Sequence, residues 1–154
     1  MTASVFFDTN VLVYAAIGTG RDSRKRQRAL ALIDSEDFGT SAQVLQEFFV
    51  TVVKKAVRPL STDQAMEWIE HLAAFPCRPI DHRLVRIAIE QSDRYGISYW
   101  DAAILSAAKA LGSHTVYSED LNDGQEYAGV RVVNPFTSST VASAPALRSP
   151  DISR

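Results

Sequence analysis

The sequence predicts a single α/β domain with a mostly parallel sheet and helices on both of its faces. Short apolar runs alternate along the chain with helical patterns of about ten residues or more, which is the order expected of strand–helix–strand units. The helical patterns also carry their own capping residues. The chain has 154 residues, of which 46% are hydrophobic, and this length and composition suit one folded domain.

The first half of the chain contains two predicted strands and three predicted helices. Ser4–Phe7 and Phe38–Ser41 are the predicted strands. Helices are predicted over Asn10–Ala16, with Thr9 or Asn10 as the N-cap, and from about Arg24 to Asp34. Ser41 is the predicted N-cap of a third helix through about Ala56, whose apolar residues recur at helical spacing: Leu45, Phe48, Phe49 and Val52.

The second half continues the alternation. Pro59 ends the third helix, and Ser61 starts a fourth. A short segment around Pro76 and Pro79, ending at Ile80, is predicted as an edge strand because proline cannot donate a hydrogen bond to a central strand. The remaining elements are two helices, each with a polar N-cap and a closing glycine, and two strands: Asp81 to Gly96, Ser98 to Gly112, Thr115–Ser118 and Val130–Val133.

Residues 1–136 are therefore predicted to form the folded domain, with five strands in its sheet. The stretch 137–154 is rich in Ser, Ala and Pro and has no sustained periodicity. We expect it to be a flexible C-terminal tail, because it lacks the apolar pattern needed to bury one face.

The composition excludes several classes of protein. The formal net charge is −2, so the chain is not a polycation that would hold nucleic acid by its overall charge. A single cysteine, Cys77, excludes an internal disulfide and a cysteine-based zinc site. No apolar run approaches the roughly 18 residues of a membrane span, and the first residues lack the pattern of a secretion signal. We therefore expect a cytoplasmic protein with no membrane partner.

Acidic residues occur at three places where strands end or helices begin. Asp8 ends the first strand, Asp120 follows the strand Thr115–Ser118, and Asp101 lies in the first turn of the preceding helix. Ligands of open α/β sheets bind beyond the carboxyl ends of the strands, where these side chains are expected to meet. Asp101 also falls within an apolar stripe, and a buried carboxylate needs a partner or a metal ion. The stripe comprises Ile97, Trp100, Ile104, Ala107, Ala108 and Leu111.

Each acid also has a simpler structural explanation. Asp8 suits a helix cap, Asp120 suits a turn, and Asp101 suits a helix N-terminus, whose dipole favours negative charge. Their convergence favours a bound cation, because several carboxylates at one crevice repel one another without it. Carboxylate oxygens prefer Mg²⁺ or Mn²⁺, and such sites typically process phosphate esters. The histidines show no ligand spacing: His71, His82 and His114.

Four segments resemble the acidic motifs of the PIN domain family, most closely those of its VapC-type toxin ribonucleases. They are FFDTNVLVYA with Asp8, SAQVLQEFFV with Glu47, SYWDAAILSAA with Asp101 and TVYSEDLNDGQ with Asp120. The resemblance extends from about residue 5 to residue 136. It implies a Mg²⁺- or Mn²⁺-dependent ribonuclease with a three-layer α/β/α fold and a mostly parallel five-stranded sheet. It also implies a homodimer and, for a toxin, neutralisation by a small antitoxin.

The resemblance implies roles for particular residues. Asp8 and Asp101 would be the principal metal ligands, Glu47 and Asp120 would complete the acidic pocket, and Thr9 or Asn10 would orient a ligand or water. Periodicity alone predicts instead that Glu47 faces solvent, because it points nearly opposite the apolar stripe of its helix. The identity of the fourth acid stays open between three residues: Asp120, Asp123 and Glu119.

Five basic residues gather within eight positions: Arg21, Arg24, Lys25, Arg26 and Arg28. Such a run is usually a solvated helix start. Alternatively, Arg24, Lys25, Arg26 and Arg28 form a track for the RNA backbone or a docking surface for an acidic antitoxin segment.

Several aromatic residues occur at helical spacing, and we expect most of them in the core. Those that are not needed in the core could form a dimer face or a groove for a partner helix. These aromatic residues are Phe48, Phe49, Trp68, Tyr99 and Trp100.

The predicted function is hydrolysis of RNA phosphodiester bonds by a Mg²⁺- or Mn²⁺-dependent endoribonuclease, the toxin of a toxin–antitoxin pair. Two alternatives stay open. One is a phosphatase-like enzyme with Asp8 as a covalent nucleophile, although such sites usually have a second acid two residues on, where this chain has Asn10. The other is a non-catalytic module of the same fold that binds RNA or protein.

Overall fold

The structure, a computed structural model, describes residues 1–137. Its sheet has six strands in the order β3-β2-β1-β4-β6-β5, and every neighbouring pair is parallel except β5 and β6. The predicted α/β class with a mostly parallel sheet is thus confirmed. The proposed tail lies, apart from residue 137, outside the described residues. The strands are Val5–Phe7 (β1), Phe38–Ser41 (β2), Cys77–Arg78 (β3), Thr115–Tyr117 (β4), Glu126–Tyr127 (β5) and Val130–Val133 (β6).

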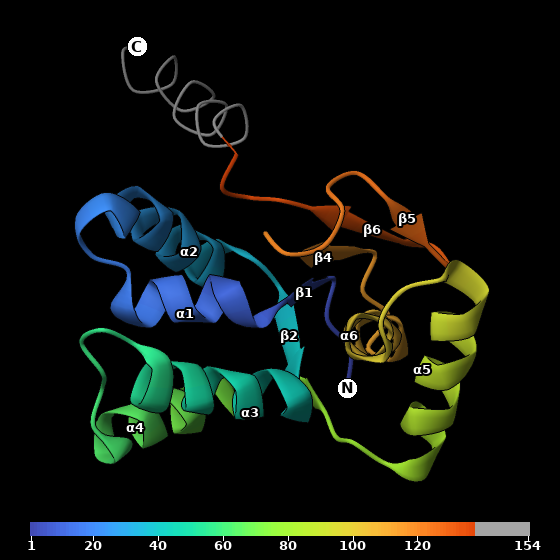
Figure 1. Ribbon diagram of the computed structural model, residues 1–154, viewed down its shortest axis with the longest axis horizontal. Coiled ribbons are helices and arrows are strands. Elements are labelled where there is room, and N and C mark those ends of the chain that lie inside the picture. The colour runs from blue at the N-terminus through green and yellow to red at the C-terminus, as the bar shows by residue number, and fades with distance from the viewer. Residues whose placement is uncertain (138–154) are drawn as a thin grey trace.

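Helices cover both faces of the sheet. Figure 1 shows α1 to α4 on one side of the strands and α5 and α6 on the other, which gives three layers. A 3-10 turn precedes α2, and a π-helical segment, Thr51–Lys55, continues α3. No helix within residues 1–137 has the length and apolarity needed to cross a bilayer. The α-helices are Thr9–Ile17 (α1), Ser23–Ser35 (α2), Ala42–Val50 (α3), Thr62–Leu72 (α4), His82–Tyr95 (α5) and Tyr99–Ala110 (α6).

Most helix ends lie where the capping residues predicted them. The side chains of Ser41, Asp81 and Ser98 each accept a hydrogen bond from the backbone N–H three residues later. Ser61 caps α4 in the same way, within a reciprocal capping box. Gly96 ends α5 with a φ of 63°, a left-handed conformation that glycine adopts without steric cost. These side-chain caps therefore fix where α3, α4, α5 and α6 begin.

The predicted count of five strands was one too low. Cys77–Arg78 is the predicted edge strand near the prolines, and it pairs with β2. The additional strand is Glu126–Tyr127, which pairs antiparallel with β6 across a tight turn. Ala128 and Gly129 both have positive φ in this turn. A strand of two residues next to such a turn is too short to show the alternation of polar and apolar residues from which strands are predicted.

The most deeply buried helix is α6, which packs against α5 on one side and the sheet on the other. Its residues 102–108 are all buried, so the helix is enclosed on nearly every side. The single apolar stripe predicted for α6 is therefore wrong in one respect: Trp100 is 65% exposed. Trp100 belongs to the first turn of α6, and the next residues of the stripe on this helix are buried.

Candidate active site

A cleft of about 420 Å³ lies where the segments after β1 and β4 meet the N-terminal parts of α1, α3 and α6. The four acids expected to gather there all line it: Asp8, Glu47, Asp101 and Asp120. Its lining also includes neutral polar side chains, one exposed aromatic ring and a single basic residue: Thr9, Asn10, Gln43, Thr51, Trp100 and Lys55. The π-helical continuation of α3 contributes Thr51 and Lys55. Carboxylates from four distant segments thus face one cleft.

Asp8 is the most buried of these acids, at 7% exposed. It, rather than Thr9 or Asn10, is the N-cap of α1, because its Oδ1 accepts a hydrogen bond of 2.7 Å from the Thr9 backbone N–H. Its Oδ2 accepts a hydrogen bond of 2.7 Å from the Ser118 hydroxyl. Asp8 is therefore both the N-cap of α1 and one of the carboxylates that line the cleft.

Burial raises the pKa of Asp8 from its ordinary value of 3.8 to about 6. The negative charges of Asp120 and Glu47 raise the pKa further, while the hydrogen bonds from Ser118 and Thr9 lower it. Three carboxylates from different elements thus interact electrostatically in this cleft. Ionisation of Asp8 is therefore less favourable here than in water, and a cation bound in the cleft would offset this cost.

Glu47 satisfies both expectations that the sequence raised for it. It is exposed, as periodicity predicts, and it lines the cleft, as the motif implies. The Thr9 hydroxyl donates to Glu47 Oε1 at 2.8 Å, and the Gln43 amide donates to Oε2 at 3.4 Å. The same Gln43 amide donates to the Trp100 carbonyl at 3.3 Å, which joins α3 to the start of α6. Glu47 is therefore held in one orientation although it is open to solvent.

Asn10 and Ser118 hold the segment after β4 against α1. The Asn10 amide donates to Asp120 Oδ2 at 3.2 Å, and its carbonyl accepts from the Glu119 backbone N–H at 3.2 Å. The Ser118 hydroxyl accepts from the Asp120 backbone N–H at 3.1 Å while it donates to Asp8. Sequence reasoning did not identify Ser118. The available signal was a small hydroxyl residue at the end of a strand, directly before two acids.

Asp101 is half-buried in the first turn of α6. Its backbone N–H donates to the Ser98 hydroxyl at 3.1 Å, so the backbone of this residue is part of the helix cap. No side chain or backbone group within residues 1–137 donates a hydrogen bond to its carboxylate. Among the acids of the cleft, Asp101 therefore has the carboxylate most available to a ligand.

The geometry separates the three candidates for the fourth acid. Asp120 lines the cleft. Asp123 lies outside it and accepts a hydrogen bond of 2.8 Å from the Asn134 backbone N–H, so its contact is structural. Glu119 forms an ion pair of 2.7 Å with Lys25, away from the cleft lining. Asp120 is thus the one candidate that the structure brings to the other three acids.

The basic cluster is mostly engaged in the fold. Lys25 forms the ion pair with Glu119, Arg26 donates to a backbone carbonyl of α1 at 3.2 Å, and Arg28 donates to a carbonyl after β6 at 3.3 Å. Arg24 is exposed. None of the four lines the cleft. The contacts of Lys25, Arg26 and Arg28 join α2 to α1 and to the segments that follow β4 and β6. A run of basic residues in the sequence does not show that its side chains make such contacts.

The donor set of the cleft suits a hydrated hard cation. It offers carboxylates and neutral oxygens, with no histidine or cysteine. Mg²⁺ usually keeps several of its waters and takes only one or two carboxylates from the protein. Within the part of the chain that the structure describes, no three acidic, histidine or cysteine side chains form a complete metal cage. The residues therefore fit a cation held by one or two carboxylates and water, and do not fit a closed structural site.

Comparisons with known proteins agree with this fold. Residues 5–129 match the family model of the PIN domain. No curated protein matches the chain significantly. Among solved structures, VapC20 of Mycobacterium tuberculosis, described as a sarcin–ricin loop cleaving toxin, is similar with a TM-score of 0.61. Its identity is 21%, and the match covers 83% of this chain and 99% of that one.

Two further similar structures are complexes. A toxin–antitoxin complex from Klebsiella pneumoniae gives a TM-score of 0.62 at 22% identity, over 86% of this chain and 98% of that one. VapBC2 of Rickettsia felis, bound to a DNA fragment from its promoter, gives a TM-score of 0.57 at 17% identity, over 84% of this chain and 97% of that one. At such identities the likeness shows the fold. Because the family model also matches most of the sequence, the chain belongs to the PIN domain family.

Proposed function

We propose that this protein is a Mg²⁺- or Mn²⁺-dependent endoribonuclease that hydrolyses RNA phosphodiester bonds. The observation that carries the proposal is the gathering of Asp8, Glu47, Asp101 and Asp120 in one cleft whose lining contains a single lysine. The carboxylates of such a cleft repel the phosphates of an RNA backbone unless a cation is bound between the carboxylates and the phosphates. Membership of the PIN domain family supports the same activity, and the similarity to VapC20, a toxin that cleaves the sarcin–ricin loop, supports RNA as the substrate.

In the proposed mechanism, Asp8 and Asp101 would hold the cation. When bound, the cation supplies positive charge to the phosphoryl oxygens and acidifies water. Glu47, oriented by Thr9 and Gln43, accepts a proton from the attacking water, and Asp120 positions that water or helps to hold a second cation. Water attacks phosphorus in line with the bond to O3′. That bond breaks, and O3′ leaves with the electron pair of the bond and takes up a proton from solvent water. The products are a 5′-phosphate and a 3′-hydroxyl, because the ribose 2′-hydroxyl takes no part.

Incubation of the protein with a labelled RNA oligonucleotide tests this activity directly. We expect cleavage with Mn²⁺ or Mg²⁺, none with EDTA, and product ends that carry a 5′-phosphate and a 3′-hydroxyl. Products that end in a 2′,3′-cyclic phosphate, or cleavage that continues in EDTA, would contradict the mechanism. A phospho-aspartate trapped at Asp8 would show the phosphatase alternative instead, and an absence of cleavage under every condition would favour the non-catalytic module.

Asp120 and Asp123 provide a matched test of the fourth acid. We expect Asp120→Asn to lower the single-turnover rate constant by about tenfold or more, because it removes a charge from the cleft. Asp123→Asn should leave the rate within about twofold, since Asp123 contacts only the backbone of Asn134 outside the cleft. Both rates are measured under saturating Mn²⁺ on one RNA. The reverse order of effects would assign the fourth acid to Asp123.

Trp100 is the exposed aromatic residue at this cleft, and we expect an unpaired RNA base to stack on its indole. The ring is 65% exposed and is supported by Tyr99, edge to face at 5.0 Å between centroids. Base stacking on an aromatic side chain contributes about 1–3 kcal/mol. Trp100→Ala should therefore raise KM for single-stranded RNA about fivefold or more with little change in kcat, and Trp100→Phe should retain most of the affinity. An unchanged KM in Trp100→Ala would exclude this contact.

The proposed activity also suggests partners. We infer that the protein is a toxin with a cognate antitoxin, because the structures similar to it include toxin–antitoxin complexes. We further propose a homodimer and a cytoplasmic location, where RNA substrates occur. Light scattering of the purified chain gives the oligomeric state. Expression with and without the adjacent gene tests the antitoxin, which should relieve growth arrest if the proposal holds.

A further inference from the structure

One wall of the acidic cleft is formed by α3 and its π-helical continuation. α1 and α3 start at the same edge of the sheet, because they follow parallel strands, and they pack against each other (Figure 1). Gln43, at the start of α3, donates to the Trp100 carbonyl. The wall therefore extends from the exposed indole past Glu47 to a single basic residue. Its lining residues are spaced four apart in the sequence: Gln43, Glu47, Thr51 and Lys55.

The π-helical segment Thr51–Lys55 keeps Lys55 on this wall. In a continuous α-helix, four residues make slightly more than one turn, so Lys55 would be rotated by about 80° from Glu47 around the helix axis. A π-helix closes its hydrogen bonds five residues apart, and its wider turn reverses part of this rotation. Such segments occur frequently at functional sites. Lys55 consequently lines the cleft, where it is the one basic side chain.

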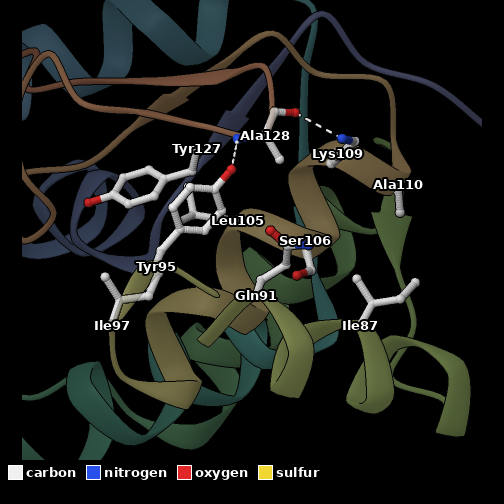
Figure 2. Close-up of a pocket in the computed structure, with 10 residues that line it drawn as sticks. All are labelled: Ile87, Gln91, Tyr95, Ile97, Leu105, Ser106, Lys109, Ala110, Tyr127 and Ala128. Atoms are coloured by element: carbon white, nitrogen blue, oxygen red, sulfur yellow. Dashed lines mark hydrogen bonds between the residues drawn. The ribbon is translucent and has the colours of Figure 1, made fainter. Parts of the chain in front are cut away.

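Lys55 has no partner in the part of the chain that the structure describes. Its side chain is exposed, and its amine makes no hydrogen bond or ion pair there. Other lysines at the surface are engaged. Lys25 pairs with Glu119, and Lys109, which lines an apolar pocket between α5 and α6, donates to the Ala128 carbonyl at 2.9 Å (Figure 2). Those two lysines stabilise the fold, whereas the amine of Lys55 is available to a ligand.

We propose that Lys55 binds a phosphate group of the RNA strand next to the scissile phosphate. This inference rests on the proposed ribonuclease function and adds a contact with its substrate. Lys55 lies eight residues beyond Glu47, or about 10–12 Å along the helix axis, so it is offset from the acids that face the scissile phosphate. Its ammonium group, on a flexible four-carbon chain, suits a phosphate oxygen. The strand then extends from Trp100 across the acids to Lys55.

The surface beyond Lys55 leaves room for the strand to continue. Ile17 follows Val13 of the cleft by about one turn on α1, and Ala56 directly follows Lys55, so a second pocket succeeds the cleft along the same helices. It has a volume of about 260 Å³, and its lining contains one acidic and one basic side chain. The excess positive charge along this route is therefore at Lys55. The pocket is lined by Ile17, Thr19, Asp22, Ala56, Val57 and Arg58.

Lys55→Met and Lys54→Met test this proposal as a pair, because both lysines are exposed in one segment and only Lys55 lines the cleft. Cleavage of a labelled single-stranded RNA is measured at low salt with saturating Mn²⁺ and excess protein. We expect Lys55→Met to raise the half-saturating protein concentration about fivefold or more, with little change in the maximal rate constant. Lys54→Met should change it by less than about twofold, and Lys55→Arg should retain most of the affinity.

Two further readouts identify the contact as one with a phosphate. The slope of log affinity against log salt concentration should become shallower by about 0.7 in Lys55→Met and stay unchanged in Lys54→Met. A single uncharged methylphosphonate linkage is also placed in turn at each position that flanks the scissile phosphate. At one of these positions it should weaken binding about as much as Lys55→Met does, and the two changes together should have no further effect, because they remove the same contact.

The proposal is wrong if Lys55→Met weakens binding equally for every substituted RNA, since the amine then contacts no particular phosphate. It is also wrong if Lys55→Met lowers the melting temperature, because the side chain then contributes to the fold. Cleavage that is equal in Lys55→Met and Lys54→Met would overturn this contact and leave the ribonuclease proposal intact.

If the unaltered protein does not cleave RNA, fluorescence anisotropy with the same RNAs measures binding alone. Weaker binding by Lys55→Met than by Lys54→Met would then support the phosphate contact although the ribonuclease proposal fails. Equal binding by the two variants, or no binding by the unaltered protein, would overturn the contact as well.

Discussion

Replacement of Asp101 by asparagine is expected to abolish Mn²⁺-dependent RNA cleavage, with a loss of at least about a thousandfold in the single-turnover rate constant. The carboxylate lines the cleft and accepts no hydrogen bond within residues 1–137, so the substitution removes a ligand for the cation and no contact of the fold. The backbone N–H that bonds to Ser98 is unchanged. The melting temperature of the metal-free protein should therefore stay the same.

Asp93→Asn is the matched control for this experiment. Asp93 is exposed on α5 and does not line the cleft, so its loss should leave the rate within about twofold. Both variants are compared with the unaltered protein on one RNA over a range of Mn²⁺ concentrations. Native cleavage by Asp101→Asn at saturating Mn²⁺ would mean that this carboxylate has no part in the reaction.

Asp8→Asn should stabilise the metal-free protein at neutral pH while it also abolishes cleavage. The pKa of Asp8 is raised from 3.8 to about 6, mainly by burial, so the folded protein disfavours the ionised carboxylate. This difference corresponds to about 3 kcal/mol of unfolding free energy. Asparagine has no charge to bury, and it is also a good N-cap, so it can keep the hydrogen bond from Thr9.

The size of this stabilisation by Asp8→Asn depends on pH. Below about pH 4 the carboxyl group is protonated in both states, and the stability that its protonated form contributes is fully present. As the pH rises from 3.8, the pKa at which the unfolded state ionises, through about 6, the pKa at which the folded state ionises, this stability is lost. The gain from Asp8→Asn should therefore be small near pH 4 and reach about 3 kcal/mol above about pH 7.

Urea unfolding in EDTA, measured at several pH values, tests this second prediction. Added Mn²⁺ should stabilise the unaltered protein at neutral pH and leave Asp8→Asn unaffected, because the cation offsets a charge that the variant lacks. Equal stability of the two proteins at every pH would show that the Asp8 carboxylate is not destabilised by burial.

The elements that the sequence predicted well are those with strong local signals. Helix starts at Ser41, Ser61, Asp81 and Ser98 follow from side chains that bond the backbone three residues later, a contact set within one turn. The acids at the ends of β1 and β4 follow from the rule that parallel strands present their carboxyl ends at one edge. Only the family resemblance predicted that Glu47 lies in the cleft. Periodicity separates the buried positions of a helix from the exposed ones, but it does not show whether an exposed position faces open solvent or a cleft.

The features that the sequence did not predict depend on contacts between distant segments. Ser118 bonds to Asp8 across 110 positions, and Lys25 reaches Glu119 across 94, so no local pattern reports either contact. Trp100 was predicted in the core because it is apolar and correctly spaced on α6, yet its side chain is exposed and lines the cleft.

Calorimetric titration of the metal-free protein with Mn²⁺ tests the central claim most directly, because it measures the binding of the cation without requiring a substrate. We expect the unaltered protein and Asp123→Asn to bind Mn²⁺ with similar affinity, and Asp8→Asn and Asp101→Asn to lose most of that binding. Undiminished Mn²⁺ binding by both of the latter variants would contradict the account, since the cation would then be held elsewhere in the molecule.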